Sequence, residues 1–381
     1  MKRIFSLLLC FVLVLSVFAG CTPAEQTPTE TTAAPLDPAK LTINGVELAK
    51  YTIVYSKDGL HSQIRASGSW IESGRMADIA KILSDELFEL TGKRLSVCPD
   101  DGQTSKYEIL IGKTERKESK NYYKTFTLHQ EKYAYGMFEE KLVIAGGSSN
   151  ACYFAIMAWL EDIKNMTGND FNAEMVKGQE ELIQVACIGD SITDGVGYIE
   201  GGETDRNYYS YPVYLQRLLG YKYYVGNYGF GSKLMTDFAM YNNFFQSLEA
   251  KPDVVTIMLG TNDSGPKHTG EKWGTAEYKQ EYFDACDSMV SKYRAANPDV
   301  QIFIMTPLYI YREDHAKRAE LAIEYDKELA ELLNLEFVDM WTPSKDGQWY
   351  FYDGLHPQGE VYGQVGEAVY NGIKDTIKKP E

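Results

Sequence analysis

The carboxyl-terminal half of the chain, residues 181–381, is predicted to be an α/β domain with a parallel sheet between two layers of helices. Strand-like and helix-like segments alternate along it, and several strand candidates are continuous apolar runs such as VVTIML and IFIM. Such runs are typical of parallel strands that helices cover on both faces. The strand candidates are Leu182–Ile188, Tyr223–Gly226, Val254–Leu259, Gln301–Met305 and Leu335–Asp339. The helix candidates are Tyr211–Leu219, Met235–Leu248, Tyr278–Ala295, Glu313–Leu333 and Glu360–Lys378.

Residues 41–178 differ in pattern and are predicted to form a small α+β accessory domain. Two helical stretches stand among short β-like runs: Met76–Leu90 has apolar residues near helical spacing, and Asn150–Ile163 is apolar enough to be buried. The β-like runs are Tyr51–Tyr55, Arg94–Val97, Tyr107–Ile111, Lys132–Met137 and Lys141–Ala145.

The amino-terminal segment indicates export. Residues 1–20 combine a basic start at Lys2 and Arg3 with a short apolar run, which is typical of a secretory signal. Phe18-Ala19-Gly20-Cys21 resembles a bacterial lipobox, although Phe18 replaces the more usual Leu, and the resemblance implies cleavage before Cys21 and lipidation of its sulfur. An ordinary signal peptide before a cysteine is the alternative. Residues 21–40 are rich in Thr, Pro, Ala and Glu, so we expect a disordered tether there. The predicted location is therefore outside the cytoplasm, on a lipid anchor.

Charge and cysteine content narrow the classes of partner. The net charge is −16, and removal of Lys2 and Arg3 with the signal would make it −18. Such a chain repels nucleic acid and anionic lipid headgroups, so neither is expected as a partner; the lipid anchor is the expected link to a membrane. Four cysteines remain in the predicted mature chain, and their spacing is not typical of a metal site: Cys98, Cys152, Cys187 and Cys286. We predict that they are buried free thiols, with two disulfides as the alternative. No metal or cofactor motif is present, so none is predicted.

Polar, turn-rich segments follow several of the predicted strands. Gly189-Asp190-Ser191 follows the first, Gly226–Gly231 the second and Gly260–Asp263 the third, while Asp353-Gly354-Leu355-His356 precedes the last helix. Sites in open parallel sheets form beyond the carboxyl ends of the strands. Gly-Asp-Ser alone is typical of a helix N-cap, so the conjunction of the four segments carries the prediction.

The four segments, in this order, resemble those of the SGNH hydrolases, also called GDSL esterases and lipases, over residues 183–375. The resemblance implies a three-layer α/β/α, flavodoxin-like domain and a serine esterase. It implies that Ser191 attacks an ester carbonyl, that His356 is the general base and that Asp353 orients the imidazole. The Asp-x-x-His spacing occurs at His61 and at His356, and of these two only His356 lies in the α/β half, which supports that residue as the base.

The resemblance also implies an oxyanion hole. Its donors would be the backbone N–H of Ser191, the Asn262 amide and a backbone N–H of the second segment. Family members commonly have Asn-x-Gly-x-Ser-Gly there, whereas this chain has Asn-Tyr-Gly-Phe-Gly-Ser. The second donor is therefore Gly231 or Ser232, and we predict Gly231. The nearby acids Asp190 and Asp263 are expected to hold loops, and His315 is expected on a solvated helix surface.

The predicted substrate is an acetylated poly- or oligosaccharide. The loop at Ser264–Lys267, followed by Trp273, resembles the branch of the family that acts on acetylated carbohydrates, and Trp273, Trp349 and Tyr352 are candidate sugar-facing aromatics. No long apolar insertion suggests a lipase lid. A lysophospholipase or thioesterase is the alternative enzyme, and a carbohydrate-binding lipoprotein without catalysis is the alternative outside enzymes.

Overall fold

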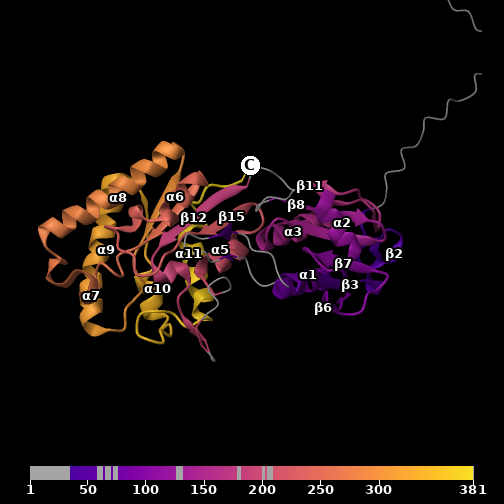
Figure 1. The fold of residues 1–381 in the computed structure, drawn as a ribbon, viewed down its shortest axis with the longest axis horizontal. Coiled ribbons are helices and arrows are strands. Elements are labelled where there is room, and N and C mark those ends of the chain that lie inside the picture. The colour runs from indigo at the N-terminus through magenta and orange to yellow at the C-terminus, as the bar shows by residue number, and fades with distance from the viewer. Residues whose placement is uncertain are drawn as a thin grey trace, which may run out of the picture. The chain divides into compact units, whose positions relative to one another are not determined.

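The described part of the chain carries two main sheets, one in each half of the sequence (Figure 1). The structure is a computed structural model that describes residues 35–57, 63–64, 70–71, 76–125, 132–177, 182–199, 202–203 and 209–380. The predicted signal segment and Cys21 lie outside these residues, as does the predicted domain boundary at 178–181. The signal, the lipidation and the boundary therefore stay predictions.

The carboxyl-terminal sheet is entirely parallel, as predicted. Its strand order is β15-β12-β16-β17-β18. The strands are β12 (Ile183–Gly189), β15 (Tyr223–Asn227), β16 (Val254–Met258), β17 (Gln301–Met305) and β18 (Glu336–Val338). The chain leaves β12 for β15 on one side and then returns to β16 on the other. This reversal opens a crevice beyond the carboxyl end of β12, which is where ligand sites form in such sheets.

Helices cover both faces of this sheet, which confirms the three-layer α/β architecture. Ala186 and Ile188 of β12 pack into one buried cluster with residues of α6, α8 and α9. Val185 and Cys187 point the other way, into a second cluster with α5 and α11. Successive side chains of a strand face opposite sides of the sheet, so both faces of the sheet are buried under helices. The helices are α5 (Tyr211–Leu219), α6 (Asn242–Glu249), α8 (Ala276–Ala296), α9 (Glu313–Leu333) and α11 (Val361–Ile373).

The helix predicted over Met235–Leu248 is wrong in its first half. Helix α6 begins only at Asn242, after a short 3-10 helix at Phe238–Met240. Tyr241 between them is extended, with φ −103° and ψ 153°. The backbone N–H of Met235 donates to Asp263 Oδ2 at 2.9 Å instead of joining a helix. A tertiary hydrogen bond thus overrides the local apolar spacing.

The amino-terminal sheet has six strands in the order β11-β8-β9-β7-β3-β6. Strands β6, β3, β7 and β9 are parallel, and β8 and β11 complete a mixed sheet through antiparallel pairings. The strands are β3 (Thr52–Tyr55), β6 (Val97–Pro99), β7 (Glu108–Ile111), β8 (Tyr133–Phe138), β9 (Lys141–Gly146) and β11 (Val176–Lys177). The predicted run Arg94–Val97 thus lies up to three residues early.

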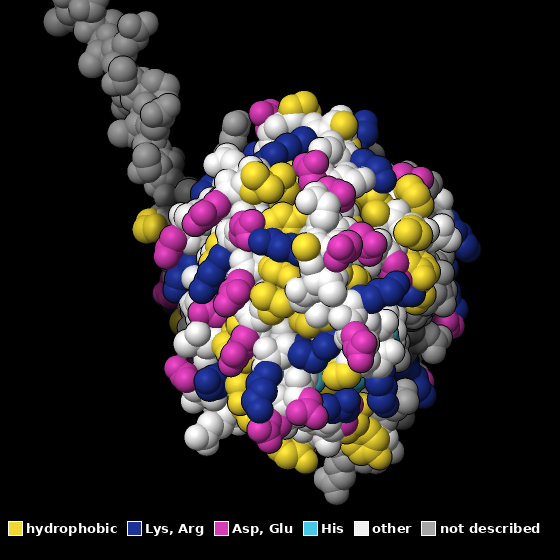
Figure 2. All heavy atoms as spheres, turned by 90° about the vertical axis from the view of Figure 1, so that its left-hand side faces the viewer, with side chains coloured by type: hydrophobic (Ala, Val, Ile, Leu, Met, Phe, Trp, Pro, Cys, Tyr) yellow, Lys and Arg dark blue, Asp and Glu magenta, His cyan; other side chains and the backbone are white. Residues whose placement is uncertain are grey.

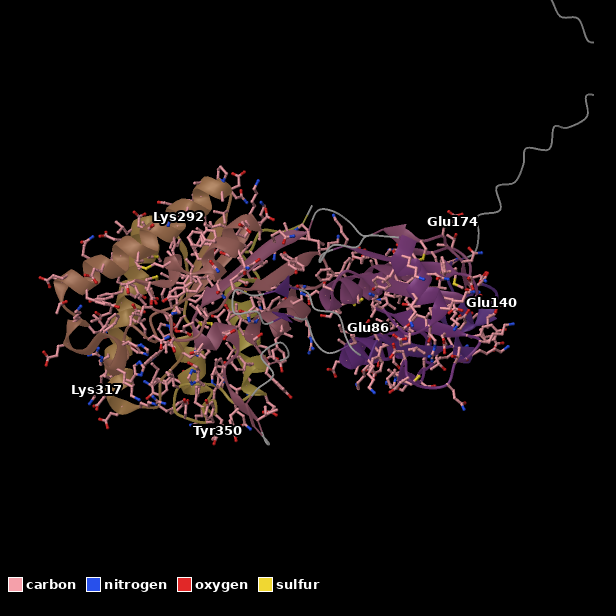
Figure 3. All side chains as sticks on the ribbon, in the orientation of Figure 1. Glu86, Glu140, Glu174, Lys292, Lys317 and Tyr350 are labelled. Atoms are coloured by element: carbon pink, nitrogen blue, oxygen red, sulfur yellow. The ribbon has the colours of Figure 1, made fainter. Side chains whose placement is uncertain are left out.

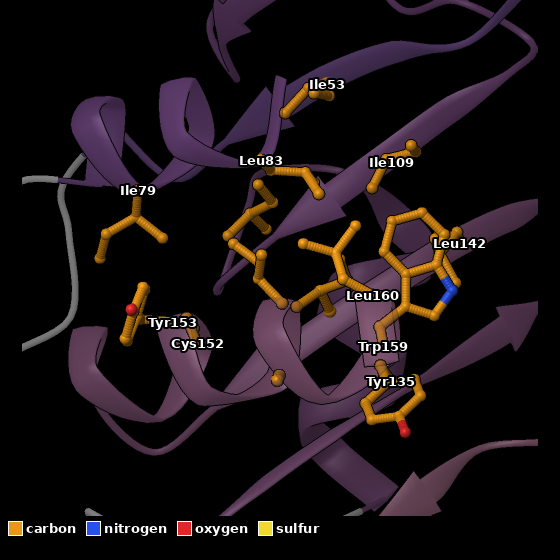
Figure 4. Close-up of a cluster of buried hydrophobic side chains, with 14 of the residues drawn as sticks. Ile53, Ile79, Leu83, Ile109, Tyr135, Leu142, Cys152, Tyr153, Trp159 and Leu160 are labelled. Carbon is orange, nitrogen blue, oxygen red and sulfur yellow. The ribbon is translucent and has the colours of Figure 1, made fainter. Parts of the chain in front are cut away.

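Two predicted helices, α1 (Met76–Thr91) and α3 (Ser149–Asn165), build the larger core of this half. Ile79 and Leu83 of α1 and Trp159 of α3 meet Ile109 and Leu142 of the sheet (Figure 4). A smaller cluster on the opposite side of the strands includes Tyr122 of α2 (Lys117–Thr125), a helix that the apolar spacing did not predict.

Described structure begins earlier than the predicted end of the tether at residue 40. Pro38–Lys40 forms a 3-10 helix, and Leu41 directly after it is 1% exposed. The backbone N–H of Asp37 donates to Asn169 Oδ1 at 2.7 Å. The prediction of disorder is therefore wrong for residues 35–40, because partners more than 100 residues away hold this segment.

The described surface carries mixed charge despite the net charge of −16. Figure 2 shows Lys and Arg interspersed with Asp and Glu over the face that it presents. The four cysteines are free, with three of them buried, as predicted. Within the described ranges, no helix is long and apolar enough to cross a membrane.

Candidate active site

Ser191 lies at the carboxyl end of β12, at the first position of the short helix α4 (Ser191–Asp194). Asp190 caps this helix, because its Oδ1 accepts the Ile192 backbone N–H at 3.0 Å. Gly189 is required before it: a Cβ there would collide with Thr193 Oγ1 and lie 2.6 Å from the Met258 carbonyl oxygen. The tight turn places the Ser191 side chain at the crevice where the strand order reverses.

Three predicted residues form a continuous hydrogen-bonded chain. Ser191 Oγ lies 2.9 Å from His356 Nε2, and His356 Nδ1 lies 2.9 Å from Asp353 Oδ2. Asp353 Oδ1 accepts the backbone N–H groups of Leu355 at 2.9 Å and His356 at 2.7 Å. This is the geometry in which a base is hydrogen-bonded to a nucleophile and an acid to the base.

The Asp353 carboxyl is held ionised. Burial by itself raises its pKa, but hydrogen bonds from the His356 backbone, the His356 ring and the Leu355 backbone outweigh burial, so the pKa lies below its ordinary value. An ionised Asp353 accepts a hydrogen bond from Nδ1–H, which leaves Nε2 of the ring free to accept a proton. The ring therefore faces Ser191 in the tautomer that a general base needs.

Arg312 also contacts Asp353, from a different element of the fold. The sequence analysis did not predict a role for Arg312. It immediately precedes α9. Its Nε donates to the Asp353 carbonyl oxygen at 2.9 Å, and its Nη2 lies 3.3 Å from Asp353 Oδ2. The backbone N–H of Tyr311 also donates to the Gly354 carbonyl oxygen at 3.0 Å. The Arg312 contacts join residues 41 apart, so no local spacing pointed to them; the position of Arg312 beyond the end of β17 was the available signal.

Two further strand ends bring donors beside Ser191. A Cβ placed on Gly231 would lie 3.9 Å from Ser191 Cβ, so the second segment passes next to the nucleophile. Among the described residues, no hydrogen bond from the backbone N–H of Ser191 or Gly231 is found. Ser232, the alternative donor, has a left-handed backbone with φ 62°. This placement favours Gly231.

Asn262 follows β16 and is 5% exposed. Its Nδ2 donates to the Lys233 carbonyl oxygen at 3.0 Å and lies 3.4 Å from Asp190 Oδ2. The first contact fixes the amide plane, while the second is long for a hydrogen bond. An amide carries two N–H donors, and the one that makes only the long contact to Asp190 is the weakly held one.

A cavity of about 270 Å³ lies beside Asn262. Residues of three segments line it, including Asn262, Lys267, Arg312, Asp314, His315 and Leu355. Leu355 directly precedes His356, so the cavity adjoins both the predicted oxyanion donor and the predicted base.

His315 was predicted on a solvated surface, and this is wrong. Its side chain is buried, and its Nε2 lies 2.8 Å from the Thr261 carbonyl oxygen and 3.0 Å from Ser264 Oγ. Burial lowers the pKa of His315, so the neutral ring donates to the Thr261 carbonyl oxygen. His315 therefore holds the loop that carries Asn262, a role that depends on how α9 packs.

The buried acids hold loops, as predicted. Burial raises the pKa of Asp190 to about 7, against hydrogen bonds from Ile192 and Thr261 that lower it. Burial likewise raises the pKa of Asp263 to about 6, and its Oδ1 accepts the Tyr278 hydroxyl at 2.9 Å. Neither contacts Ser191 Oγ or the His356 ring through a hydrogen bond in the described structure.

Two of the three predicted sugar-facing aromatics lie in the core instead. Trp273 is 7% exposed, packs against Tyr278 and Tyr325, and donates through Nε1 to the Arg318 carbonyl oxygen at 3.0 Å. Trp349 is 9% exposed and belongs to the cluster under α11. The prediction is therefore wrong for Trp273 and holds for no more than an edge of Trp349, because both rings fill space between packed elements.

Tyr352 lies at the site. It is 40% exposed, and its ring stacks near the His356 ring with centroids 6.1 Å apart. Tyr198, which sequence reasoning missed, lies 5.4 Å from Tyr352, centroid to centroid. The two tyrosines place aromatic surface on one side of His356. No group of three or more His, Cys, Asp and Glu side chains suited to a metal ion occurs in the described part of the chain.

Part of the chain is similar to known proteins. Residues 187–363 match the model of the GDSL-like Lipase/Acylhydrolase family, and they include every residue of the hydrogen-bonded chain. This segment is therefore similar to that family.

The chain is also similar to a curated protein of Xylanibacter ruminicola. That protein is an acetylxylan esterase, 32% identical over 224 residues, which are 51% of this chain and 44% of the relative. The chain thus spans less than half the length of that relative. Solved structures similar to this chain include the acetylxylan esterase Axe2 of Geobacillus stearothermophilus. That structure is 23% identical with a TM-score of 0.40, over 53% of this chain and 96% of its own. Another is LAE5, an α/β hydrolase from the metagenome of Lake Arreo, 20% identical with a TM-score of 0.40, over 51% of this chain and 96% of its own.

Proposed function

We propose that the protein is a serine esterase that removes O-acetyl and other short acyl groups from carbohydrates. The observation that carries the proposal is the hydrogen-bonded chain from Ser191 through His356 to Asp353 at a strand-order reversal. Two further observations support it: the match to the GDSL-like family and the acetylxylan esterase relative.

Each residue then has a defined step. His356 Nε2 takes the Ser191 hydroxyl proton as Oγ attacks the ester carbonyl carbon. The oxyanion accepts hydrogen bonds from the backbone N–H groups of Ser191 and Gly231 and from the Asn262 amide. When the intermediate collapses, His356 returns the proton to the leaving sugar hydroxyl, and acetyl remains on Ser191. Water, deprotonated by His356, then releases acetate and restores the serine.

The cavity beside Asn262 favours a short acyl group. Its volume of about 270 Å³ corresponds to roughly nine water molecules at about 30 Å³ each, which suits an acetyl group with part of a sugar ring. The small volume leaves little room for a long acyl chain, which counts against the lysophospholipase or thioesterase alternative.

Chain-length preference tests this proposal. We expect the mature protein to release acetate from acetylated xylan, and to cleave p-nitrophenyl octanoate with a kcat/KM lower than that for the acetate ester by about tenfold or more. A preference for the octanoate would replace the carbohydrate reading by the acylhydrolase alternative. Cleavage of no ester at all would leave the carbohydrate-binding lipoprotein as the better account.

We also propose that the protein acts outside the cytoplasm on a lipid anchor at Cys21. The basic start, the apolar run and the small residues before Cys21 support this. Cells fed a labelled fatty acid should incorporate the label into the wild type, and Cys21→Ser should lose it and leave the membrane fraction. Equal labelling of both proteins would contradict the anchor. Release of an unlabelled wild type would favour an ordinary signal peptide.

A further inference from the structure

A second concave surface lies in the carboxyl-terminal half of the chain, next to the segment that carries Asp353 and His356. It is a groove of about 580 Å³ whose lining includes Tyr309, Tyr311, Lys345, Gln348, Trp349 and Tyr350; we call it the aromatic groove. Tyr311 is 45% exposed and Tyr350 is 61% exposed. Tyr350 marks the lower edge of this half of the chain in Figure 3. Large aromatic side chains this exposed need an explanation, because their burial would be favourable.

The Tyr309 and Tyr311 rings of the aromatic groove pack against neighbouring aromatic rings. The Tyr309 ring packs edge-on against Tyr311 at 4.8 Å and against Trp341 at 4.9 Å, centroid to centroid. The Tyr311 ring lies 5.4 Å from that of Phe351. A ligand that stacks on these rings therefore does not have to immobilise them, which lowers the entropic cost of binding.

The chemistry of the aromatic groove suits a carbohydrate. Sugar rings present C–H faces that pack on aromatic faces, and their hydroxyls need hydrogen-bond partners around the rim. Here the rings are mainly tyrosines, and Lys345 and Gln348 add polar groups to the same lining. Lys345 Nζ lies 5.4 Å from the Tyr309 ring centroid.

The aromatic groove adjoins the segment that carries the candidate base. The backbone N–H of Gln358, two residues after His356, donates to the Tyr350 carbonyl oxygen at 3.0 Å. Phe351 forms a bridge with Pro357 and is buried, while its neighbours Tyr350 and Tyr352 are exposed. Tyr350, which lines the groove, is thus two residues along the chain from Tyr352, whose ring centroid lies 6.1 Å from that of His356.

We propose that the aromatic groove is a distal subsite for the backbone of a polysaccharide whose esterified sugar lies at Ser191. The inference rests on the proposed function and adds to it the class of substrate: a chain of several linked pyranoses rather than an isolated acetylated sugar. The subsite contributes binding through rings that take no part in the chemistry. Its loss therefore affects long substrates and leaves small esters unchanged.

The test separates sugar binding from turnover. Full-length mature protein carrying Ser191→Ala is titrated with unacetylated xylohexaose by calorimetry, alone and with Tyr350→Ala, Tyr350→Phe or Phe245→Ala added. Tyr350→Ala should weaken binding about twofold to tenfold, as expected for one stacked ring. Tyr350→Phe keeps the ring and should bind nearly as the parent does. Phe245, an exposed aromatic on α6, is the matched control and should change nothing.

Kinetics on the otherwise unmodified protein complete the test. Tyr350→Ala should lower kcat/KM for acetylated xylohexaose by the same factor, mainly through KM, and leave p-nitrophenyl acetate unchanged. Equal affinity for xylohexaose with and without the Tyr350 ring would overturn the inference, and acetate release by the wild type would then still uphold the esterase. If no ester is cleaved but Tyr350→Ala abolishes xylohexaose binding, the subsite stands and the esterase falls. Self-association that Tyr350→Ala removes, without any affinity for sugar, would assign the surface to a second copy of the chain.

Discussion

Replacing Ser191 by alanine is expected to lower the rate of ester hydrolysis by roughly 10⁴- to 10⁶-fold. The residual rate would come from the oxyanion donors and from substrate binding, which the substitution leaves in place. The expectation follows from the 2.9 Å contact between Ser191 Oγ and His356 Nε2, because no other described serine is hydrogen-bonded to that ring. The change removes one oxygen from a buried turn, so the fold should persist.

The measurement is acetate release from acetylated xylan together with cleavage of p-nitrophenyl acetate. Ser291→Ala, on the exposed face of α8, is the matched control and should retain full activity. Thermal unfolding of each variant checks that the protein is folded. If folded Ser191→Ala keeps more than about one hundredth of the wild-type rate, Ser191 is not the nucleophile.

Replacing Asp353 by asparagine is expected to lower kcat by about 10⁴-fold. The amide presents an N–H donor where the carboxylate accepted, so the imidazole turns to the tautomer with its proton on Nε2. That nitrogen then donates to Ser191 Oγ and is unable to take its proton. The backbone contacts to Leu355 and His356 survive, because the asparagine oxygen still accepts them, so the loop should keep its shape.

The pH profile gives this variant a signature that a damaged fold would not produce. The pKa of Asp353 lies below its ordinary value, so the carboxylate stays charged as the pH falls through the range in which an imidazole usually titrates. It accepts the hydrogen bond from His356 Nδ1 throughout that range. In Asp353→Asn no charged acceptor faces Nδ1 at any pH, so kcat should stay depressed by about 10⁴-fold across the range while the variant still unfolds near the wild-type temperature. Asp346→Asn, an exposed acid on α10 (Trp341–Asp346), is the control. Wild-type kcat in Asp353→Asn at any pH in this range would contradict an orienting role for Asp353.

Local pattern was enough to predict the layers, and the resemblance to the SGNH hydrolases supplied the expected reacting groups. Continuous apolar runs predicted β12, β16 and β17, because a parallel strand buried on both faces admits few polar residues. Strand ends predicted only where a site would form, because the carboxyl ends of parallel strands meet at one edge of a sheet. The roles of Ser191, Asn262, Gly231, Asp353 and His356 came from the resemblance of their four segments to that family.

The sequence by itself thus determined the parallel architecture and the chemistry-bearing side chains, and only the tertiary structure decided which neighbours surround them. Trp273 has the composition expected of a sugar platform, yet α8 and α9 bury it. His315 begins a polar helix, yet that helix turns it toward the loop of Asn262. Arg312 reaches Asp353 across 41 residues. Burial and long-range hydrogen bonds depend on which distant elements of the chain pack together. A pattern of a few neighbouring residues carries no information about that packing.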